Sequence, residues 1–306
     1  MKLVFMGTPD FAVPSLKALV EAGHEVAAVF TQPDKPKNRG MKLQTTPVKE
    51  YALTQNLPVY QPQKLRDGEA LAVLKNIMPE LIVVAAYGKL LPKDILELPA
   101  LGCINVHSSL LPKYRGAAPI NWAILNGESE SGVSIQHMAE GLDTGDVIDC
   151  AVTEISLEDT AATLYERLAN MGAELLVKVV RALGDGTASR TAQNDEESCY
   201  APMLSKELSA MDWNRTARQL HDQVRGLIPW PSAVTEVDGV RCKVWKTTLT
   251  GESSCKTAGT IVQADKKALK VVCGDGQVLQ IDELQPDGKK RMAATAFLLG
   301  HPIKVN

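Results

Sequence analysis

The strongest constraint on the fold is a series of short, almost wholly apolar segments in the first 155 residues, separated by stretches with helical periodicity. Uninterrupted apolar segments are typical of strands that are buried on both faces. The expected strands are residues 3–6, 26–31, 59–60, 81–86 and 103–107, and helical patterns occupy 11–21, 48–55 and 70–77. This alternation predicts an α/β fold with a doubly wound, mostly parallel sheet that helices cover on both faces.

The rest of the chain changes character twice. Strands at 133–138 and 147–155 are expected at a different edge, followed by a long helix over 159–183 that Gly184-Asp185-Gly186 ends. Residues 187–199 are short of large apolar side chains and rich in Thr, Gln, Asn and Glu, which indicates a linker. We expect domains at 1–186 and 207–306, joined by a linker at 187–206.

The last hundred residues have an all-β pattern after one helix. The helix is expected at 212–225, and the strands at 233–237, 240–247, 260–263, 269–272 and 277–281. The pairs Asp238-Gly239 and Asp275-Gly276 are strong hairpin signals, because both positions of a tight hairpin turn favour such residues. Short strands joined by turns predict a small β-barrel, of the OB-like type that often binds nucleic acid.

Composition limits the environment and the chemistry. The six cysteines lie far apart with no C-x-x-C pair, which argues against structural zinc and disulfides and favours a reducing cytoplasm. The five histidines form no H-x-x-x-H or H-E-x-x-H pattern, so we expect no metal. No apolar run approaches the roughly 20 residues that a membrane span needs, so we expect no membrane partner.

Common nucleotide and hydrolase motifs are missing from the sequence. Met6-Gly7-Thr8-Pro9-Asp10 follows a predicted strand but is not G-x-G-x-x-G. There is also no G-x-x-x-x-G-K-[ST] and no G-x-S-x-G. A nicotinamide site, a nucleotide phosphate site and an α/β-hydrolase site are therefore unsupported.

The net charge of −3 is unevenly divided along the chain. Residues 1–206 carry 19 basic and 25 acidic side chains, a net charge of −6, whereas residues 207–306 carry 14 and 11, a net charge of +3. A mildly basic C-terminal part fits a polyanionic partner, and chance composition explains it equally well.

Polar residues stand where the last predicted parallel strand ends. Side chains alternate along a strand, so Asn105 and His107 face one side while Ile104 and Val106 face the other. Ligand crevices form at the carboxyl edge of open α/β sheets. An amide donor beside an imidazole could stabilise an oxyanion and move a proton at one carbonyl. The same spacing also fits a strand end followed by a half-buried structural histidine.

The loop Gly141-Leu142-Asp143-Thr144-Gly145-Asp146 is a second candidate. In one interpretation Asp143 lies beside His107, where a carboxylate favours the imidazolium and fixes the ring. In the other, the loop is a tight turn whose aspartates bond to their own backbone.

A third candidate is the long polar loop at residues 31–43. It contains four cations, Lys35, Lys37, Arg39 and Lys42, but only one acid, Asp34. Loops of this length are uncommon in compact domains and are usually functional or disordered. The charge fits a phosphate-rich substrate, and a solvated insert is the alternative. Apolar residues expected at the same edge, at 87–91, 110–112 and Trp122, could line a slot for a flat ring or belong to the core.

These segments together resemble the folate-dependent formyltransferases. The resemblance begins with Asn105-x-His107, then Ser109-Leu110-Leu111-Pro112 and the Asp143 loop. It extends nearly end to end through Phe5-Met6-Gly7-Thr8-Pro9-Asp10-Phe11, Thr31-Gln32-Pro33-Asp34, Ala86-Tyr87-Gly88, Arg115-Gly116-Ala117-Ala118-Pro119-Ile120, Lys243-Val244-Trp245 and Leu284-Gln285-Pro286. Their combination in this order is specific, although each segment alone is not. Residues 186–206 match least well.

Within that family the resemblance is to the members that formylate initiator tRNA. It implies a formyltransferase-type, Rossmann-like catalytic domain and a C-terminal β-barrel that binds tRNA. The implied reaction moves the formyl group of 10-formyltetrahydrofolate, a co-substrate, to the free amino group of methionyl-initiator tRNA. The implied protein is a cytoplasmic enzyme of translation initiation, and we expect it to act as a monomer.

The resemblance also assigns site residues. The catalytic set falls on Asn105, His107 and Asp143. The expected folate-binding residues are those of the matching Ser-Leu-Leu-Pro segment and apolar neighbours at the same edge: Ser109, Leu110, Leu111, Pro112, Tyr87, Gly88, Leu90 and Leu142. The expected tRNA-binding residues are the cations of the polar loop: Lys35, Lys37, Arg39 and Lys42.

Other functions would use parts of the same pattern. A formyltransferase for a small amine, such as an amino sugar nucleotide or glycinamide ribonucleotide, would share the three polar residues. The cationic loop and the barrel segments near Trp245 and Gln285-Pro286 favour tRNA over such an acceptor. A formyl-folate hydrolase would not need the cationic loop, and a non-catalytic tRNA-binding protein would not need Asn105, His107 and Asp143.

Overall fold

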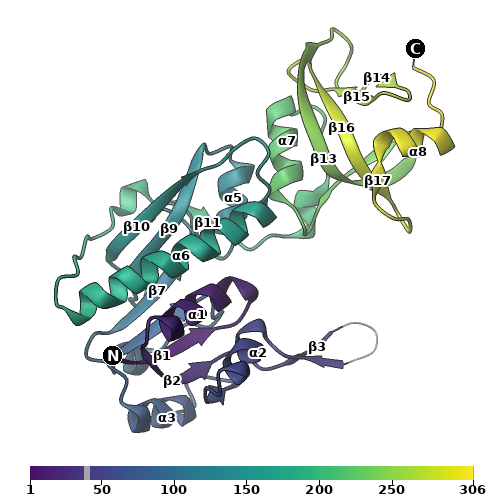
Figure 1. Ribbon diagram of the computed structural model, residues 1–306. Helices are drawn as coiled ribbons and strands as arrows, with labels where there is room; N and C mark the ends of the chain where they lie inside the picture. Colours follow the sequence, from purple (N-terminus) through teal and green to yellow (C-terminus); the bar gives the residue numbers. More distant parts are fainter. Residues whose placement is uncertain (38–41, 306) are drawn as a thin grey trace. The chain divides into compact units, whose positions relative to one another are not determined.

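The computed structural model describes residues 1–37 and 42–305 and forms two compact units (Figure 1). Unit 1 consists of Met1–Gly116, Ser131–Thr153 and Tyr165–Ala201, and unit 2 of Ala117–Glu130, Glu154–Leu164 and Pro202–Asn306. The expected domain limits at 1–186, 187–206 and 207–306 stay predictions.

The main sheet of unit 1 has the strand order β10-β9-β7-β6-β1-β2-β5. Its strands are β1 (Lys2–Gly7), β2 (Glu25–Phe30), β5 (Val59–Tyr60), β6 (Leu81–Ala85), β7 (Cys103–His107), β9 (Glu130–His137) and β10 (Val147–Glu154). From β5 to β7 neighbouring strands are parallel, and β9 runs antiparallel to β7. The predicted doubly wound, mostly parallel α/β sheet is confirmed.

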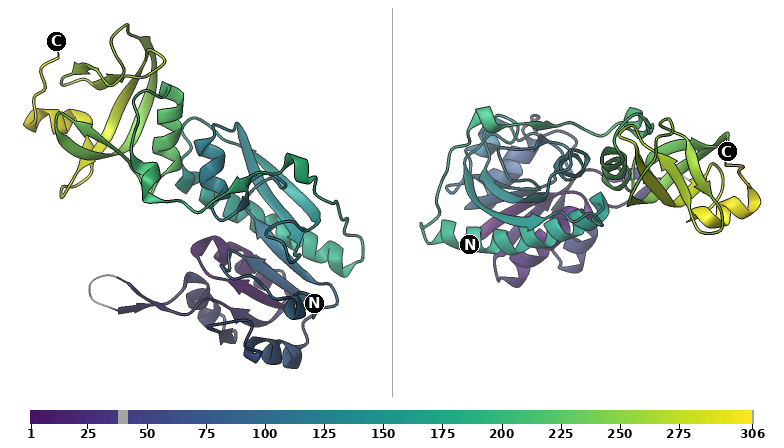
Figure 2. Two further views of the ribbon diagram at one scale, coloured as in Figure 1. Left: turned by 180° about the vertical axis from the view of Figure 1, so that it is seen from behind. Right: turned by 90° about the horizontal axis from the view of Figure 1, so that it is seen from above.

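Helices cover both faces of this sheet (Figures 1 and 2). They are α1 (Val13–Glu21), preceded by a 3-10 turn at Asp10–Ala12, α2 (Pro47–Thr54), α3 (Glu69–Ile77), α4 (Lys93–Leu96) and α6 (Ala161–Gly184). Leu74 of α3 and Ile95 of α4 join the core cluster on one face with Val84. On the other face Gly172 of α6 lies over β7, where a Cβ would come within 2.9 Å of Val106.

A loop was predicted for residues 31–43, but the structure has short strands within this segment and at its end. Residues Lys35–Lys37 form β3 and Lys42–Gln44 form β4, and these two strands pair as an antiparallel hairpin. Both flanks are polar, so no apolar alternation marks them as strands. Arg39 lies outside the described residues.

Short elements appear between and after the predicted ones. They are β8 (Arg115–Gly116), α5 (Pro119–Leu125), a 3-10 turn at Asp195–Glu197 and β11 (Tyr200–Ala201). Residues 187–201, here called the return segment, follow α6. Thr191 bridges to Val147 of β10, and β11 pairs in parallel with β8.

Unit 2 is built on an antiparallel sheet with the order β12-β13-β16-β15-β14. Its elements are a 3-10 turn at Lys206–Ser209, α7 (Ala217–Gly226), β12 (Ala233–Val237), β13 (Val240–Ser253), β14 (Ile261–Ala264), β15 (Leu269–Val272), β16 (Gln277–Pro286), β17 (Met292–Ala293) and α8 (Ala294–Gly300). The sheet is consistent with the predicted small β-barrel-like domain. Asp238 and Gly239 form the two-residue turn between β12 and β13 with φ of 47° and 76°, as predicted.

Helix α7 begins later than the predicted residue 212, because Thr216 and Gln219 form a capping box at its start. The helix buries charge. Arg225 and Asp222 are 4% and 3% exposed, and Arg225 Nε lies 2.7 Å from Asp222 Oδ1. Arg225 Nη1 also donates to the carbonyls of Ser156 and Asp159, both at 3.0 Å. This pair joins α7 to the segment before α6 within unit 2.

Candidate active site

The register of the sheet places Asn105 and His107 on one face at the end of β7. Asn105 pairs with Val84 of β6 and with Gln136 of β9, and His107 pairs with Ser134. Paired residues of neighbouring strands point to the same side, so these side chains share the face that Val84 and the cluster beneath α3 and α4 occupy. The alternation predicted from the sequence is therefore observed.

The loop between β9 and β10 folds back against the sheet and carries Asp143. Asp143 has a φ of 53°, in the left-handed region that costs a non-glycine residue free energy. Gly145 lies so close to β9 that a Cβ would come within 1.7 Å of the His137 carbonyl oxygen. Only glycine allows this approach, which fixes where the loop turns.

The Asp143 carboxylate is 12% exposed and accepts hydrogen bonds on both oxygens. Oδ2 accepts from the Gly116 backbone N at 2.9 Å, and Oδ1 accepts from Gln136 Nε2 at 3.1 Å. Asn105 Nδ2 lies 3.5 Å from Oδ1, and His107 Nδ1 lies 3.7 Å from Oδ2. The structure thus brings Asn105, His107 and Asp143 together.

The other ring nitrogen of His107 is occupied by the backbone. His107 Nε2 lies 3.0 Å from the carbonyl oxygen of Tyr114. A carbonyl oxygen only accepts, so Nε2 carries a proton, and Nδ1 is the nitrogen on the Asp143 side.

The segment after β7 is tightly held. Ser109 is 1% exposed, and its hydroxyl donates to the Lys113 carbonyl at 2.7 Å. The Leu111 amide donates to Ser134 Oγ at 3.0 Å, and the peptide bond between Leu111 and Pro112 is cis. Leu110 and Pro112 are half-buried. The four residues expected to bind folate thus directly follow the strand that carries Asn105 and His107.

The remaining expected folate residues follow β6, the parallel neighbour of β7, or adjoin Asp143. Tyr87 is 1% exposed, and burial raises its pKa to about 12. Gln32 Nε2 donates at 3.1 Å to the carbonyls of both Tyr87 and Gly88. Leu90 and Leu142 are 64% and 45% exposed. These two exposed apolar side chains are available to a ligand.

The expected tRNA-binding cations belong to the β3–β4 hairpin. Lys35 is exposed at the start of β3. Lys37 ends β3 and Lys42 begins β4, where the two residues pair. At the base of the hairpin, the hydrogen bond from Lys49 lowers the pKa of Asp34.

Three groups that contact Asp143 were not among the predicted site residues. They are Gln136, the Gly116 amide and Gln193, whose Nε2 donates to the Asp143 carbonyl at 2.9 Å. Gln136 could have been found, because it and Ser134 alternate with the apolar residues Val133 and Ile135 of a predicted strand. Gly116 and Gln193 carry no local signal, since they reach Asp143 from distant parts of the chain.

Two kinds of feature are missing from the described residues, 1–37 and 42–305. No cluster of three or more His, Cys, Asp or Glu side chains there could hold a metal ion. None of the helices in that part of the chain has the length and apolar character of a membrane-spanning segment.

Comparison with known proteins gives consistent matches over both parts of the chain. The formyl transferase family model matches residues 1–180, and the model of the formyl transferase C-terminal domain matches 203–302. Methionyl-tRNA formyltransferase of Clostridioides difficile (strain 630) is 51% identical over 306 residues, 99% of this chain and 98% of the relative. That of Pelotomaculum thermopropionicum is 49% identical over 304 residues, 99% and 96%.

Solved structures with the same fold are more distant in sequence. A sugar 3N-formyl transferase, solved in the presence of dTDP and 5-N-formyl-THF, has a TM-score of 0.70 at 20% identity, covering 95% of this chain and 99% of that one. An N-formyltransferase from Helicobacter canadensis, in complex with folinic acid and dTDP-3-aminofucose, has a TM-score of 0.69 at 23% identity, covering 92% and 98%.

The fold, the two family models and the full-length relatives agree. The chain belongs to the formyl transferase family, which confirms the resemblance seen in the sequence. Its relatives at about 50% identity over the whole chain place it, within that family, among the methionyl-tRNA formyltransferases.

Proposed function

We propose that this enzyme transfers the formyl group of 10-formyltetrahydrofolate to the α-amino group of methionyl-initiator tRNA. The observation that carries the proposal is the 51% identity to a methionyl-tRNA formyltransferase over 99% of the chain. Similarity of this extent covers the catalytic segments and the C-terminal unit alike, so it bears on the acceptor as well as on the chemistry. A cytoplasmic, monomeric enzyme is part of the same proposal.

The proposed reaction is a direct acyl transfer. The neutral amine of the methionyl ester attacks the formyl carbon, a carbon–nitrogen bond forms, and the carbonyl oxygen becomes an oxyanion. Asn105 Nδ2 and the protonated Nδ1 of His107 would hold that oxygen. One well-placed donor contributes about 10²–10³ in rate. What supports this assignment is that both groups lie within 3.7 Å of the same carboxylate.

Collapse of the intermediate requires one proton to move. The amine becomes cationic as it attacks, and N10 of the folate must be protonated as its bond to the formyl carbon breaks. Asp143 would accept the amine proton and His107 would donate one to N10, and the proton on Asp143 would then pass to His107 Nδ1, which restores both groups. The products are the formylated amine and tetrahydrofolate, so atoms and charge balance without a covalent enzyme intermediate. The carboxylate is held ready for this role by Gly116 and Gln136.

Ser109, Leu110, Leu111 and Pro112, with Tyr87, Gly88, Leu90 and Leu142, are proposed to bind the folate. They follow adjacent parallel strands or adjoin Asp143, so they lie at the edge where the proposed chemistry occurs. The exposed apolar surface of Leu90 and Leu142 fits a flat ring.

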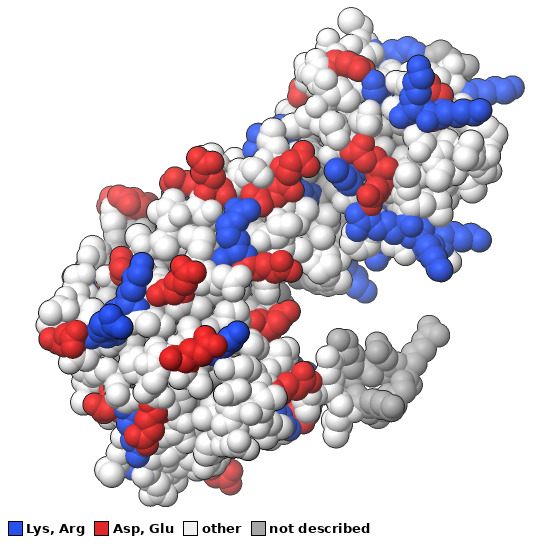
Figure 3. All heavy atoms as spheres, viewed as in Figure 1, with Lys and Arg blue, Asp and Glu red and all other residues white. Residues whose placement is uncertain are grey.

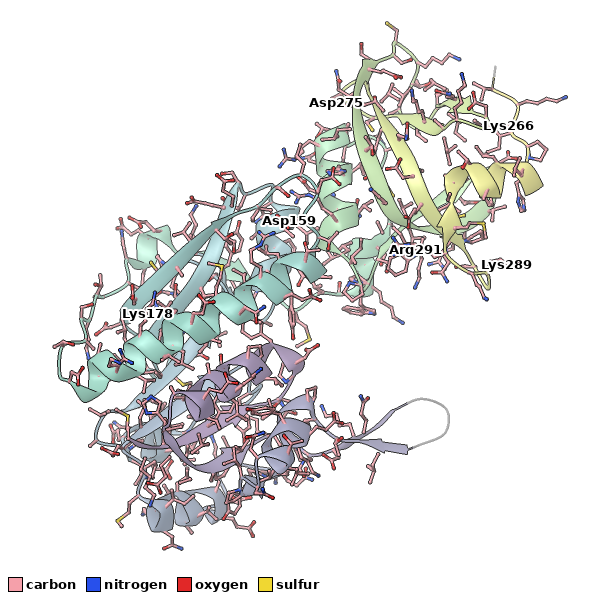
Figure 4. All side chains as sticks on the ribbon, in the orientation of Figure 1. Asp159, Lys178, Lys266, Asp275, Lys289 and Arg291 are labelled. Atoms are coloured by element: carbon pink, nitrogen blue, oxygen red, sulfur yellow. The ribbon has the colours of Figure 1, made fainter. Side chains whose placement is uncertain are left out.

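Cations of each unit are proposed to bind the phosphates of the tRNA. In unit 1 these are Lys35, Lys37, Arg39 and Lys42. In unit 2, lysine and arginine side chains project from the surface among acidic ones (Figure 3), and Lys289 and Arg291 lie at the turn between β16 and β17 (Figure 4). The Arg291 guanidinium lies over Trp245, 5.1 Å from the ring centroid, and pairs with Glu283. Stacked guanidinium groups of this kind are suited to phosphate recognition.

The decisive experiment offers labelled 10-formyltetrahydrofolate with four acceptors: methionyl-initiator tRNA, free methionine, an amino sugar nucleotide and water alone. We expect label in acid-precipitable, base-labile formylmethionyl-tRNA and none in the other three. Preferred formylation of the sugar nucleotide would assign the enzyme to small amines. Release of labelled formate without an acceptor would indicate a hydrolase.

A further inference from the structure

The return segment reaches the candidate active site through one side chain. Thr191 exchanges two backbone hydrogen bonds with Val147, both 2.9 Å long, and β11 is fixed to β8 a few residues later. Gln193 lies between these two anchors and is half-buried. The segment predicted as a linker therefore has fixed contacts on both sides of Gln193.

Gln193 makes hydrogen bonds with both ends of its amide. Nε2 donates to the carbonyl of Asp143 at 2.9 Å and to that of Gly145 at 2.7 Å, with Gln136 Oε1 farther away at 3.4 Å. Oε1 accepts from Arg115 Nε at 3.0 Å and from Arg115 Nη2 at 2.8 Å.

This set of partners determines the side chain that fits. Backbone carbonyls only accept and a guanidinium only donates, so the residue between them must donate on one side and accept on the other. A glutamate can accept from Arg115 but cannot donate to the carbonyls. A lysine can donate to the carbonyls but would meet the cation of Arg115. A glutamine meets both requirements.

Arg115 extends the contact to the other side of Asp143. Its side chain is 12% exposed and also pairs with Asp195 of the return segment at 2.8 Å. The next residue, Gly116, donates its amide to Asp143 Oδ2. Gln193 thus holds the backbone of Asp143. Gly116, the residue after Arg115, holds the Asp143 carboxylate.

We propose that Gln193 is a positioning residue for catalysis, which holds the strained Asp143 backbone so that the carboxylate lies beside His107 and Asn105. The inference rests on the proposed function and extends it: the return segment completes the active site, and Gln193 acts on the reaction only through Asp143. Misplacing a reacting group by about 1 Å can cost about 10²-fold in rate.

The test variant is Gln193→Glu, which keeps the acceptor for Arg115 and removes the donors to the loop. We expect kcat for methionyl-tRNA to fall about 10-fold to 100-fold while KM for the tRNA changes less than about twofold. Asn194→Ala is the matched control, because the Asn194 side chain makes hydrogen bonds with Glu196 and Glu197 of its own turn. It should retain the wild-type kcat.

A double variant separates positioning from general damage. In an Asp143→Ala background, Gln193→Glu should have little further effect on kcat, because the group that Gln193 positions is already absent. Additive losses, a wild-type kcat in the single variant, or a loss confined to KM would each overturn the inference.

A structural measurement tests the inference apart from activity. Hydrogen exchange at the Gly116 amide and over residues 141–147 should accelerate in Gln193→Glu, while exchange in β6 and β7 stays unchanged. Unchanged protection of the loop would overturn the inference even if the enzyme formylates tRNA. Conversely, if wild-type enzyme fails to formylate methionyl-tRNA, the proposed function fails, and faster loop exchange would still support the positioning role.

Discussion

At the level of single residues, we expect the loss of Asn105 or His107 to lower the rate of formyl transfer and to leave tRNA binding nearly unchanged. We predict that Asn105→Ala and His107→Ala each lower kcat at least about 10²-fold, because each removes a donor to the developing oxyanion. The dissociation constant for tRNA should stay within about twofold, since neither residue belongs to the proposed phosphate contacts. Single-turnover formylation and filter binding measure the two quantities, and near-normal turnover in either variant would contradict the assignment.

His221 makes a residue-scale prediction about pH and stability. The residue lies 7% exposed between Thr247 Oγ1 at 2.9 Å and the Leu157 carbonyl at 3.0 Å. Burial lowers its pKa, as do Arg225 and Arg218, while Leu157 and Asp222 act in the opposite direction. A histidine whose pKa is lower in the folded state binds its proton more readily when unfolded. Its contribution to stability is therefore complete above the ordinary value of 6.5 and declines as the pH falls below it.

We expect the free energy of unfolding to decline as the pH falls below about 6.5, with a slope of at most about 1.4 kcal/mol per pH unit from this one group. Urea unfolding of the wild type and of His221→Gln at several pH values measures the difference, and the variant should show the smaller slope. Burial also lowers the pKa of His137, so part of the acid dependence should remain. Equal slopes in the two proteins would contradict the prediction.

Single residues also show which parts of the candidate active site can be predicted from the sequence and which cannot. Asn105 and His107 could be found from the sequence, because polar and apolar residues alternate near the carboxyl end of their predicted strand. Asp143 could be placed beside His107 only as one of two interpretations, because its loop fits an ordinary turn. Gln193 could not be found from its surroundings in the sequence, because its role depends on hydrogen bonds to residues 48 and 50 positions earlier.

At the level of secondary structure, helix α7 shows how a polar helix can be buried. We predict that Arg225→Met lowers the free energy of unfolding by about 3–5 kcal/mol, because Asp222 loses its buried partner and the carbonyls of Ser156 and Asp159 lose the Arg225 donor. Arg218→Met is the matched control, since Arg218 contacts the same aspartate at 2.7 Å but is 46% exposed. It should cost less than about 1 kcal/mol. Chemical denaturation measures the free energy of unfolding of both variants. Equal losses of stability would show that the burial of the arginine does not determine the effect of its removal.

The elements that the sequence predicted well are those whose own residues contain the signal. Strands β1, β2 and β6 are almost wholly apolar segments, and α6 has a long apolar stripe. The short pair β8 and β11 has no such signal, because each has only two residues and forms by pairing with a segment far away in the chain. The β3–β4 hairpin was missed for a related reason, since its polar strands resemble a loop.

At the scale of the whole molecule, the proposed tRNA contacts predict a strong effect of salt. We expect the logarithm of the tRNA association constant to fall linearly with the logarithm of salt concentration, with a slope of about −0.7 to −0.9 for each phosphate contacted, the values for single strands and for duplex DNA. Replacing Lys289 and Lys290, which both lie in the turn between β16 and β17, by alanine should make that slope shallower without changing the KM for folate. Binding titrations between about 50 and 200 mM salt measure it. A flat profile would argue that the chain does not bind the acceptor through its phosphates.

The pairing of β8 with β11 has a consequence for how the enzyme is made. A nascent chain that has just completed α6 already contains Asn105, His107 and Asp143, but Gln193 and β11 have not yet been synthesised. The hydrogen bonds from Gln193 to the Asp143 loop can form only after the ribosome has added the residues that follow α6. A protease cut between α6 and Thr191 would separate Gln193 and β11 from the helix that precedes them, without cutting any strand of the main sheet.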